Sequence, residues 1–526
     1  MGQADTMSYS HIQAPQRAAE IPDIDLVSFT LRHAMQLGDK PVLVDGASGQ
    51  TLGYAELARA VHSFAAGLAA RGFAKGDTFG ICVPNLPEFA VAFHGVLAAG
   101  GRCTTANPLY TARELGHQLA DTRATMLLTV PPLLEVAREA AAPTGCEVVV
   151  LGEAHEATAF SELLGDPKAV PAVAIDPALD TAAILYSGGT TGLPKGVLLS
   201  HRNLVATLAL AEQALDVASD DVVIAALPFF HIYGLHVILN IALQAGATVV
   251  SMPRFELGQF LDLIERHGVT RAYIVPAMAV TLADADLEGR DLTSLRHVLS
   301  AAAPLGTALT EALERRLGCP VSEGFGMTEM SGITHLVPPV GGTRKSGSIG
   351  PPIPGVECRL VDPETGEDVA TGERGELWVR SPKVMQGYLN NPQATAEMID
   401  PDGWLRTGDI AVMDNDGWFE IVGRIKEIIK HKGFQVFPAE LEMILGAHPA
   451  VADCAVIGVP DERAGEIPKA YVVPEGDEFD PDALIRYVAE RVAPYKRIRV
   501  IEAVEQIPKS PSGRVLRHAL RTKVAD

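Results

Sequence analysis

The sequence lacks the features that mark membrane, secreted or zinc-binding proteins. No apolar run approaches the roughly 20 residues that a helix needs to cross a bilayer. The first residues, Met1-Gly-Gln-Ala-Asp-Thr, have no basic stretch followed by an apolar core, so we expect no signal peptide. The six cysteines form no C-x-x-C pair, and the fifteen histidines form no H-x-x-x-H pattern. We therefore expect reduced core thiols, no cysteine or histidine metal centre, and a cytoplasmic location.

The chain also lacks an excess of positive charge. It carries 43 Lys and Arg against 65 Asp and Glu, a formal net charge of −22. So acidic a protein is not expected to be a general binder of nucleic acid or of anionic membranes. A polyanionic ligand would have to bind at a local cluster of basic residues.

A length of 526 residues exceeds one ordinary hydrophobic core and predicts at least two domains. Short β-branched runs alternate with Ala- and Leu-rich helical stretches, a pattern typical of layered α/β proteins. Gly/Pro-rich turns and short strands at 347–377 indicate a β-rich subdomain. We expect strands at 41–44, 78–83, 126–130, 147–151, 222–226, 247–251 and 272–275, and helices at 57–70, 88–97 and 257–267.

We place a domain boundary after Gly423-Arg424, because the residues beyond it have a pattern of their own. Pro438 suits the first turn of a helix, 451–459 alternates like a strand, and 481–492 has apolar residues at helical spacing. The expected organisation is a loose segment 1–24, a large domain 25–424 and a small α+β domain 425–526.

The most informative stretch is Tyr186-Ser-Gly-Gly-Thr-Thr-Gly-Leu-Pro-Lys-Gly-Val197. Glycines let backbone N–H groups turn toward an anion, hydroxyls donate hydrogen bonds to phosphate oxygens, and the lysine adds positive charge. It differs from a Walker loop, because Pro194 precedes Lys195 and Gly196 stands where that loop has a magnesium-binding hydroxyl. The alternative is a flexible Gly/Thr surface turn, which ten ordered positions ending in Pro-Lys-Gly disfavour. The pattern predicts a polyphosphate loop at the end of a buried strand.

At these residues the chain resembles the adenylate-forming superfamily of acyl-CoA synthetases, luciferases and peptide-synthetase adenylation domains. Within that superfamily it most resembles 4-coumarate:CoA ligases, from about residue 25 onward. The resemblance implies ATP, Mg²⁺ and CoA as cofactors, a carboxylic acid as substrate, and a small C-terminal domain that rotates between two half-reactions. It also implies that ATP phosphates are bound by Ser187, Gly188, Gly189, Thr190, Thr191, Gly192 and Lys195.

A second motif, Glu323-Gly-Phe-Gly-Met-Thr-Glu329, begins 136 residues after Ser187, the spacing expected in the resembled family. An aromatic ring between glycines can lie against a purine, and a carboxylate can hold magnesium. Taken alone, the motif also fits an ordinary strand–turn–helix corner. With the resemblance, we assign Glu323, Gly324 and Phe325 to the nucleotide, Thr328 and Glu329 to catalysis, and Glu329 to Mg²⁺.

The third motif joins Trp404-Leu-Arg-Thr-Gly-Asp409 to Val422-Gly-Arg-Ile-Lys426. A carboxylate is a natural acceptor for two ribose hydroxyls. A turn aspartate and a surface arginine are the alternative. The resemblance implies that Asp409 binds the ribose with Arg424 beside it, and that Lys426 stands at the hinge.

The fourth motif, Lys430-His-Lys-Gly-Phe-Gln435, is a local basic cluster. Such clusters are usually solvated charge runs. The resemblance implies instead that Lys430 and Gln435 contact the acyl-phosphate region and that Lys432 and Gly433 face CoA. Arg254 matches a basic position that meets CoA phosphates.

The fifth motif, Pro508-Lys-Ser-Pro-Ser-Gly-Arg-Val-Leu-Arg517, departs from the resembled family, whose loop ordinarily ends Ser-Gly-Lys. That lysine bridges the substrate carboxylate and the α-phosphate, and here the position is Arg514. Arginine keeps the charge but presents a planar fork, and losing a preorganised donor typically costs about 10²–10³ in rate. Three interpretations stay open: Arg514 works natively, Lys509 takes over the role, or the chain is an altered variant arrested in one half-reaction.

The segment Phe229-Phe-His-Ile-Tyr-Gly-Leu235 resembles the part of coumarate ligases that lines the aromatic acid's pocket. A tyrosine hydroxyl there can meet a phenol while its ring packs on the substrate ring. A buried aromatic strand-to-helix corner is the alternative. A serine, a glycine and a Pro-Val pair usual nearby are replaced by Val237, Ala301 and Gly332-Ile333. The predicted pocket residues are His231, Tyr233, Val237, Ala301, Gly332 and Ile333, with His231 also assigned to catalysis and Ala302 to the nucleotide.

We predict a hydroxycinnamate or cinnamate as the acid, with another aryl acid or a medium-chain fatty acid as alternatives. Twelve residues follow Arg514, too few for the carrier domain of a peptide synthetase. A luciferase-type oxygenase shares the adenylation motifs and stays open. An adenylate-binding protein with impaired adenylation is the alternative of another class, suggested by Arg514 alone.

Overall fold

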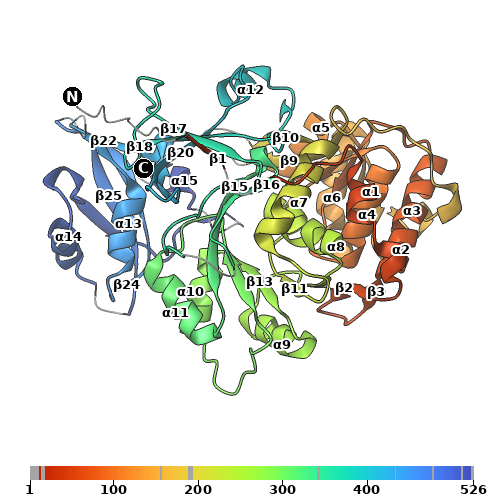
Figure 1. Cartoon of the computed structure of the whole chain (residues 1–526), viewed down its shortest axis with the longest axis horizontal. Coiled ribbons are helices and arrows are strands. Elements are labelled where there is room, and N and C mark those ends of the chain that lie inside the picture. Colours follow the sequence, from red (N-terminus) through yellow and green to blue (C-terminus); the bar gives the residue numbers. More distant parts are fainter. Residues whose placement is uncertain are drawn as a thin grey trace, which may run out of the picture.

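The computed structural model describes residues 11–13, 18–153, 157–187, 194–339, 344–432, 434–461, 463–476, 479–510, 513 and 515–522. Within these residues the strands form two eight-stranded sheets, a five-stranded antiparallel sheet and a separate sheet near the C-terminus (Figure 1). Helices pack on the two large sheets. This architecture confirms the predicted α/β class with a β-rich subdomain and a smaller C-terminal part.

The first eight-stranded sheet has the order β19-β10-β9-β5-β4-β6-β7-β8. The strands from β9 to β8 run parallel, and helices α4, α5 and α6 make crossovers between them, as parallel pairing requires. By contrast, β10 pairs antiparallel with β9 and with β19. The elements are α3 (Tyr54–Ala70), β4 (Thr78–Ile81), α4 (Pro87–Ala98), β5 (Arg102–Thr105), α5 (Ala112–Thr122), β6 (Ala124–Thr129), α6 (Leu134–Ala141), β7 (Glu147–Val150), β8 (Thr158–Ala159), β9 (Thr181–Ser187), β10 (Lys195–Ser200) and β19 (Gly387–Tyr388).

The second eight-stranded sheet has the order β16-β15-β14-β13-β11-β12-β2-β3. Its strands are parallel except at the edges, where β16 and β3 pair antiparallel with their neighbours. The carboxyl ends of β13, β14 and β15 therefore meet at one edge, the place where open α/β sheets bind ligands. The elements are β2 (Pro41–Asp45), β3 (Thr51–Gly53), β11 (Val222–Ala225), β12 (Thr248–Ser251), α9 (Leu257–His267), β13 (Arg271–Ile274), α10 (Pro276–Asp284), β14 (His297–Ser300), α11 (Thr307–Leu317), β15 (Val321–Met327) and β16 (Gly332–Leu336).

Helix α7 (His201–Leu215) contacts both β10 of the first sheet and β16 of the second. The N-cap of α7 is Ser200, whose hydroxyl oxygen accepts a hydrogen bond from the Asn203 N–H over 3.1 Å. The π-helix η5 (Tyr233–Asn240) continues into α8 (Ile241–Ala245). Helix α1 (Leu26–Thr30) packs against α7 and α8, and α2 (Ala34–Leu37) packs against α3.

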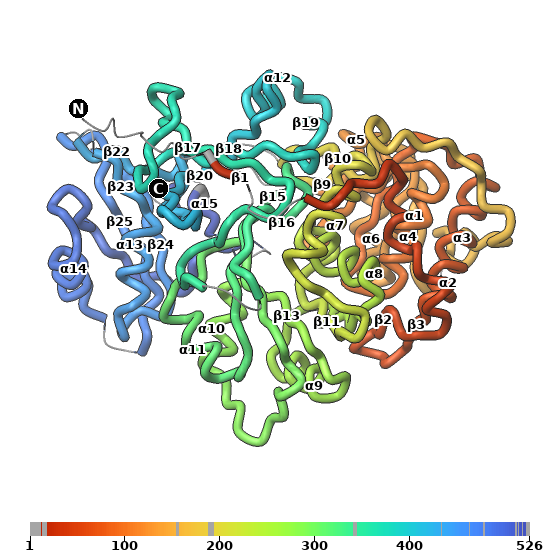
Figure 2. The backbone as a smooth tube through the Cα atoms, in the orientation of Figure 1, coloured from red at the N-terminus to blue at the C-terminus, as the bar shows by residue number. Residues whose placement is uncertain are grey.

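The five-stranded sheet has the order β1-β17-β18-β20-β21. Its edge strand comes from the N-terminal region, drawn in red beside β17 in Figure 2. The elements are β1 (His11–Gln13), β17 (Glu357–Val361), β18 (Arg374–Arg380), α12 (Pro392–Met398), β20 (Leu405–Met413) and β21 (Phe419–Arg424).

The C-terminal sheet has the order β23-β22-β25-β24, with β26 parallel to β25. The predicted helix over 481–492 is wrong at its end, since α14 stops at Ala489. Pro494 follows, and the residue before a proline is driven into extended backbone, as Ala493 is (ψ 151°). The elements are β22 (Ile429–His431), β23 (Phe434–Val436), α13 (Pro438–Gly446), β24 (Val451–Asp461), β25 (Gly465–Pro474), α14 (Pro481–Ala489), β26 (Val500–Ala503) and α15 (Arg517–Thr522).

The hydrophobic cores divide along the same line as the sheets. The largest core contains buried residues from Leu26 to Phe419, and a second begins at Ile429. The two parts touch where Phe437 packs on β21: a Cβ added at Gly423 would lie 2.7 Å from Cδ1 of Phe437. The Arg374 guanidinium also lies 4.9 Å from the centre of the Phe437 ring. Glycine at 423 therefore lets the C-terminal part sit close against the five-stranded sheet.

Candidate active site

Ser187 and Lys195 face each other across the β9–β10 hairpin, as register partners. Strand β9 enters the hairpin through buried residues, so both ends of the predicted phosphate loop are anchored in the first sheet. The predicted loop residues Gly188, Gly189, Thr190, Thr191 and Gly192 lie outside the described residues.

The Glu329 carboxylate links this hairpin to the second sheet. Its Oε1 accepts a hydrogen bond from Ser187 Oγ at 2.8 Å and another from the Tyr388 hydroxyl at 2.9 Å. Glu329 is only 4% exposed, and its backbone carbonyl accepts from the Met385 N–H at 2.9 Å. Burial and the nearby carboxylate raise the pKa of Tyr388, so its hydroxyl stays protonated and donates. Glu329 is thus fixed in place by two segments far from it in sequence, one at Ser187 and the other at residues 385–388.

The Glu329 carboxylate could hold Mg²⁺ only together with oxygen atoms from a bound ligand and water. No described group of three or more His, Cys, Asp or Glu side chains could form an all-protein metal site. Mg²⁺ is commonly held by one or two carboxylates together with substrate phosphates and water. A single Glu329 carboxylate beside a phosphate loop fits that mode. Lys195 adds positive charge nearby, with its Nζ 4.8 Å from the centre of the Tyr388 ring.

Thr328 precedes Glu329 in the short 3₁₀ helix η6 (Thr328–Met330) and is 7% exposed. The chain reaches it through the end of β15, where the backbone of β16 comes close. A Cβ added at Gly326 would lie 2.1 Å from the Gly332 carbonyl oxygen, so only glycine fits there. Close packing of β15 on β16 therefore places Thr328 and Glu329 beside the hairpin.

Glu323 supports the surrounding loops. Its carboxylate accepts backbone hydrogen bonds from Leu305 at 2.9 Å and from Gly347 at 3.2 Å, one on each oxygen. Burial raises the pKa of Glu323. A direct contact with a nucleotide stays a prediction for this residue, and the geometry gives it a positioning role.

Phe325 lies half-buried at the end of β15, with its ring 5.9 Å from that of His335 in an edge-on contact. Gly324 before it is tightly packed, since an added Cβ would lie 3.3 Å from Cδ1 of Leu299. On the neighbouring strand, β14 ends at Ser300 and continues into Ala301 and Ala302. Ala302 is exposed and has φ +78°, which L-residues other than glycine adopt at a cost. Such strain concentrates at functional sites.

Asp409 and Arg424 are register partners across β20 and β21. Arg424 Nε lies 2.8 Å from Asp409 Oδ1, and the Asp409 side chain is 3% exposed. The structure therefore brings together the two residues predicted at the ribose. Lys426 follows in η7 (Ile425–Glu427) and is exposed.

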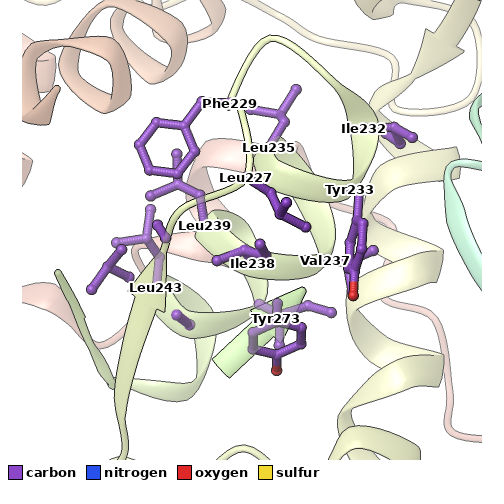
Figure 3. Packing of buried hydrophobic residues seen from close by; sticks show 14 of the residues in the cluster. Leu227, Phe229, Ile232, Tyr233, Leu235, Val237, Ile238, Leu239, Leu243 and Tyr273 are labelled. Atoms are coloured by element: carbon purple, nitrogen blue, oxygen red, sulfur yellow. The ribbon is translucent and has the colours of Figure 1, made fainter. Parts of the chain in front are cut away.

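The predicted acyl-pocket residues gather around η5. Figure 3 shows Tyr233 and Val237 beside each other on one side of this helix, both buried. The Tyr233 hydroxyl donates to the Leu299 carbonyl oxygen at 3.1 Å. Gly332 has φ +113°, and a Cβ added there would lie 3.0 Å from Cγ2 of Val237. Residues from η5, β14 and β16 thus converge, and π-helices of this kind are frequent at functional sites.

His231 precedes this helix and is partly buried. Its Nδ1 accepts from the Tyr233 N–H at 3.3 Å, and burial lowers its pKa to about 4. The ring is therefore neutral near pH 7. Ile333 follows Gly332 and is 5% exposed.

The residues predicted for the acyl-phosphate region, Lys430 and Gln435, and those predicted for CoA, Lys432 and Arg254, are exposed. Lys430 and Gln435 are register partners in the β22–β23 hairpin. Lys432 has φ +52°, and its N–H donates to the Ala464 carbonyl at 2.7 Å. Gly433 lies outside the described residues, and Arg254 is an exposed residue before α9.

The C-terminal loop reaches the second sheet. A Cβ added at Gly513 would lie 3.5 Å from Cγ2 of Val275, the residue after β13. Arg514 lies outside the described residues. Lys509 does not point to the site, because its Nζ forms an ion pair with Asp453 Oδ2 at 2.6 Å within the C-terminal part.

Residues 31–389 match the AMP-binding enzyme family, and residues 440–514 match the AMP-binding enzyme C-terminal domain. The chain belongs to the AMP-binding enzyme family. The first match alone covers more than half of the chain.

Among curated relatives of this AMP-binding enzyme, 4-coumarate–CoA ligase 5 from Oryza sativa subsp. japonica is 43% identical over 521 residues, covering 96% of each chain. Among solved structures, ATP-bound MatB from Rhodopseudomonas palustris has a TM-score of 0.87 at 30% identity, covering 96% of this chain and 99% of its own. The same MatB without ligand gives a TM-score of 0.77 at 30% identity and equal coverage. The chain therefore resembles the ATP-bound arrangement more than the apo one.

In this AMP-binding enzyme, Tyr388, which donates a hydrogen bond to Glu329, was not predicted from the sequence. Tyr388 lies in Gln386-Gly-Tyr-Leu-Asn390, where a tyrosine in a turn-rich stretch carries no chemical signal of its own. Its pairing with β10 through β19 is a long-range contact that local pattern does not predict.

None of the described helices has the length and apolar character needed to cross a membrane.

Proposed function

We propose that this AMP-binding enzyme is an ATP-dependent acid:CoA ligase, which joins a carboxylic acid to CoA through an acyl-adenylate and releases AMP and pyrophosphate. The observation that carries the proposal is the meeting of Ser187, Tyr388 and Glu329 at one carboxylate oxygen. This point lies between the phosphate hairpin and the ligand-binding edge of the second sheet. The name of the curated relative, 4-coumarate–CoA ligase 5, agrees with such a function.

In the first half-reaction, a carboxylate oxygen of the acid attacks the α-phosphorus of ATP and the bond to pyrophosphate breaks. Lys195 neutralises charge on the departing pyrophosphate. Glu329 would hold Mg²⁺, which supplies further charge neutralisation on the phosphates when bound. Asp409 accepts hydrogen bonds from the ribose hydroxyls, with its own charge balanced by Arg424. Phe325 offers an aromatic face for the adenine.

In the second half-reaction, the CoA thiolate attacks the acyl carbon and the carbon–oxygen bond to AMP breaks. We propose that the C-terminal part turns about Lys426 so that Lys432 and Gly433 replace the loop of Gly513 over the site. Neither step requires a covalent bond to the protein. Binding and orientation supply the catalysis.

We propose the division into a segment 1–24, a domain 25–424 and a mobile domain 425–526. The separation of the cores after Phe419 and before Ile429 supports this boundary. The higher similarity to ATP-bound MatB, together with the Gly513–Val275 contact, supports the adenylate-forming orientation for the arrangement seen here.

We propose a hydroxycinnamate or cinnamate as the acid. Support comes from the similarity to 4-coumarate–CoA ligase 5 and from the buried Tyr233, which lies among aromatic and aliphatic side chains such as Tyr273. Another aryl acid or a medium-chain fatty acid would be revealed by the substrate panel below.

We propose that the protein works in the cytoplasm. All six cysteines are buried and free, as expected of a protein from a reducing compartment. Separation of cell fractions followed by immunodetection tests this location.

The function is tested by incubating the protein with MgATP, CoA and a panel containing 4-coumarate, cinnamate, benzoate and octanoate. Thioester absorbance, AMP and pyrophosphate are followed together. We expect AMP and thioester in equal amounts, with 4-coumarate or cinnamate giving the highest kcat/KM. If no acid in the panel gives pyrophosphate or thioester, the ligase function is contradicted. If thioester forms from supplied acyl-adenylate and CoA but not from MgATP, acid and CoA, the result favours an adenylate-binding protein impaired in the first step.

A further inference from the structure

Lys383 is a fully buried lysine beside the site (0% exposed). It lies in the segment 381–386 between β18 and β19, and its Nζ donates a hydrogen bond to the Ile333 carbonyl of β16. None of the ion pairs recorded in the described part of the chain includes Lys383. Since a buried amine without a carboxylate partner is costly, its retention calls for a physical reason.

Within the described part of the chain, no carboxylate forms an ion pair with Lys383, and its charge acts on the polar side chains of Cys358 and His335. Cys358 Sγ lies 3.4 Å from Nε2 of His335. Burial raises the pKa of Cys358 and lowers the pKa of His335, and the charge of Lys383 makes a smaller, lowering contribution to both. Burial also lowers the pKa of Lys383 itself, to about 7. The amine therefore loses its proton far more readily than an exposed lysine, which reduces the cost of its burial.

The backbone around Lys383 is tied to the active site at two further points. The Ser331 hydroxyl donates to the Lys383 carbonyl at 2.8 Å. Two residues later, the Met385 N–H donates to the Glu329 carbonyl at 2.9 Å. From the other side, the Asn203 side-chain amide donates to the carbonyls of Pro382 and Val384, both at 2.9 Å.

Strand β16 is the edge strand of its sheet, and its outer side is paired only in part. His335 forms an isolated bridge with Pro352, and the Thr334 carbonyl accepts from the Ile353 N–H at 2.8 Å, whereas the Ile333 carbonyl accepts from Lys383. β16 carries Gly332 and Ile333 of the acyl pocket, and it directly follows η6 with Glu329. The position of this one strand therefore affects both the acid and the magnesium carboxylate.

We propose that Lys383 is a positioning residue for the first half-reaction, which clamps strand β16 of the acyl pocket to the segment that fixes Glu329. Its side chain holds the strand through Ile333, and its main chain holds the turn through Ser331. It touches neither substrate nor the reacting atoms. This inference rests on the proposed ligase function, because it concerns the formation of the acyl-adenylate.

The test compares Lys383→Met, which keeps the chain length but loses the donor, with Lys383→Gln, which keeps a neutral donor. Lys168→Met, at an exposed lysine in η4 (Pro167–Ala169), is the matched control. Acid-dependent ATP–pyrophosphate exchange measures the first half-reaction, and thioester formation from preformed acyl-adenylate measures the second. Circular dichroism and thermal melting follow folding.

For Lys383→Met we expect the KM for the acid to rise about tenfold and pyrophosphate exchange to slow by a similar factor, with the second half-reaction within twofold of wild type. Lys383→Gln should recover most of the loss, and Lys168→Met should match wild type. A lower melting temperature with unchanged KM values would overturn the proposal, as would equal losses in both half-reactions. An inactive wild type would refute the ligase function instead, so the two failures are distinct.

If Lys383→Met does not fold, Ser331→Ala provides the second test, because it removes only the bond to the Lys383 carbonyl. We then expect a smaller rise in the acid KM, about threefold, with an unchanged second half-reaction. No change in the acid KM of Ser331→Ala would overturn the clamp.

Discussion

Tyr388 donates its hydroxyl hydrogen to Oε1 of Glu329 over 2.9 Å, and this bond joins an edge strand of the first sheet to the turn that follows β15 in the second. Ser187 donates to the same oxygen from the phosphate hairpin. One carboxylate thereby fixes the relative position of the groups that are proposed to meet the phosphates and the magnesium.

Replacing Tyr388 with Phe removes this hydrogen bond while keeping the ring beside Lys195. A hydrogen bond to a charged group contributes about 1.5–3 kcal/mol, so we expect kcat/KM for MgATP to fall about tenfold or more. The second half-reaction from preformed acyl-adenylate should stay unchanged. Steady-state kinetics at varied MgATP check this, with Tyr487→Phe on α14 as the control. Unchanged MgATP kinetics would show that Glu329 is oriented without Tyr388.

Arg514 and Lys509 are distinguished by substitution. Lys509 is held by Asp453, so Lys509→Met should leave pyrophosphate exchange within twofold of wild type. Arg514→Ala should slow it by about 10²–10³, the usual cost of losing a preorganised donor from the transition state. Arg514→Lys then decides whether the arginine is native to the reaction: slower exchange favours native Arg514, whereas faster exchange favours an altered catalytic position.

The sheets were largely predictable from the sequence, because buried β-branched runs and amphipathic helices carry strong local signals. Helix α9 (Leu257–His267) has the predicted bounds, and each predicted strand is present with its ends shifted by at most two residues. The end of α14 was wrong, because the apolar spacing continues to Val492, while the helix ends at Ala489, ahead of the extended Ala493 before Pro494.

The site residues that belong to recognisable sequence motifs could be predicted. Ser187, Glu329, Asp409 and Arg424 were named, and the structure brings them together in pairs. Tyr388 and Lys383 were not, because their roles depend on contacts with segments more than 45 residues away. Glu323 shows the converse: its residue type suggests a ligand contact, while its two backbone hydrogen bonds depend on loops that only the fold brings to it.

The Tyr233 hydroxyl makes a specific prediction about acid preference. Its hydrogen is donated to the Leu299 carbonyl, so its oxygen is left to accept a hydrogen bond from a substrate phenol. We expect wild type to prefer 4-coumarate over 4-methoxycinnamate, which has no hydrogen to donate. Tyr233→Phe should reduce that preference about tenfold, or ~1.4 kcal/mol. Ratios of kcat/KM for the two acids measure the effect, and an unchanged ratio would exclude Tyr233 from phenol recognition.

Buried histidines predict the acid stability of the protein. Burial lowers the pKa of His94, His201 and His231 to about 4 and of His236, His297 and His335 to about 3. These rings are neutral when folded but take up protons near pH 6.5 when unfolded. Their contribution to stability is therefore complete above pH 6.5 and is lost as the pH falls toward 4 and 3.

Melting temperatures measured from pH 8 to pH 4 check this expectation. We expect a steep decline below pH 6.5 and a shallower one for His94→Gln, with His117→Gln at an exposed site behaving like wild type. An acid decline of equal slope in His94→Gln and wild type would show that His94 does not contribute.

The formation of an acyl-adenylate by direct attack of the substrate carboxylate on the α-phosphorus is tested by oxygen transfer. The enzyme is supplied with MgATP, CoA and 4-coumarate labelled with ¹⁸O in both carboxylate oxygens, and the products are analysed by mass spectrometry. We expect one ¹⁸O atom in the phosphate of each AMP and none in pyrophosphate. AMP without ¹⁸O, or label in a released phosphate in its place, would contradict direct attack of the carboxylate on the α-phosphorus.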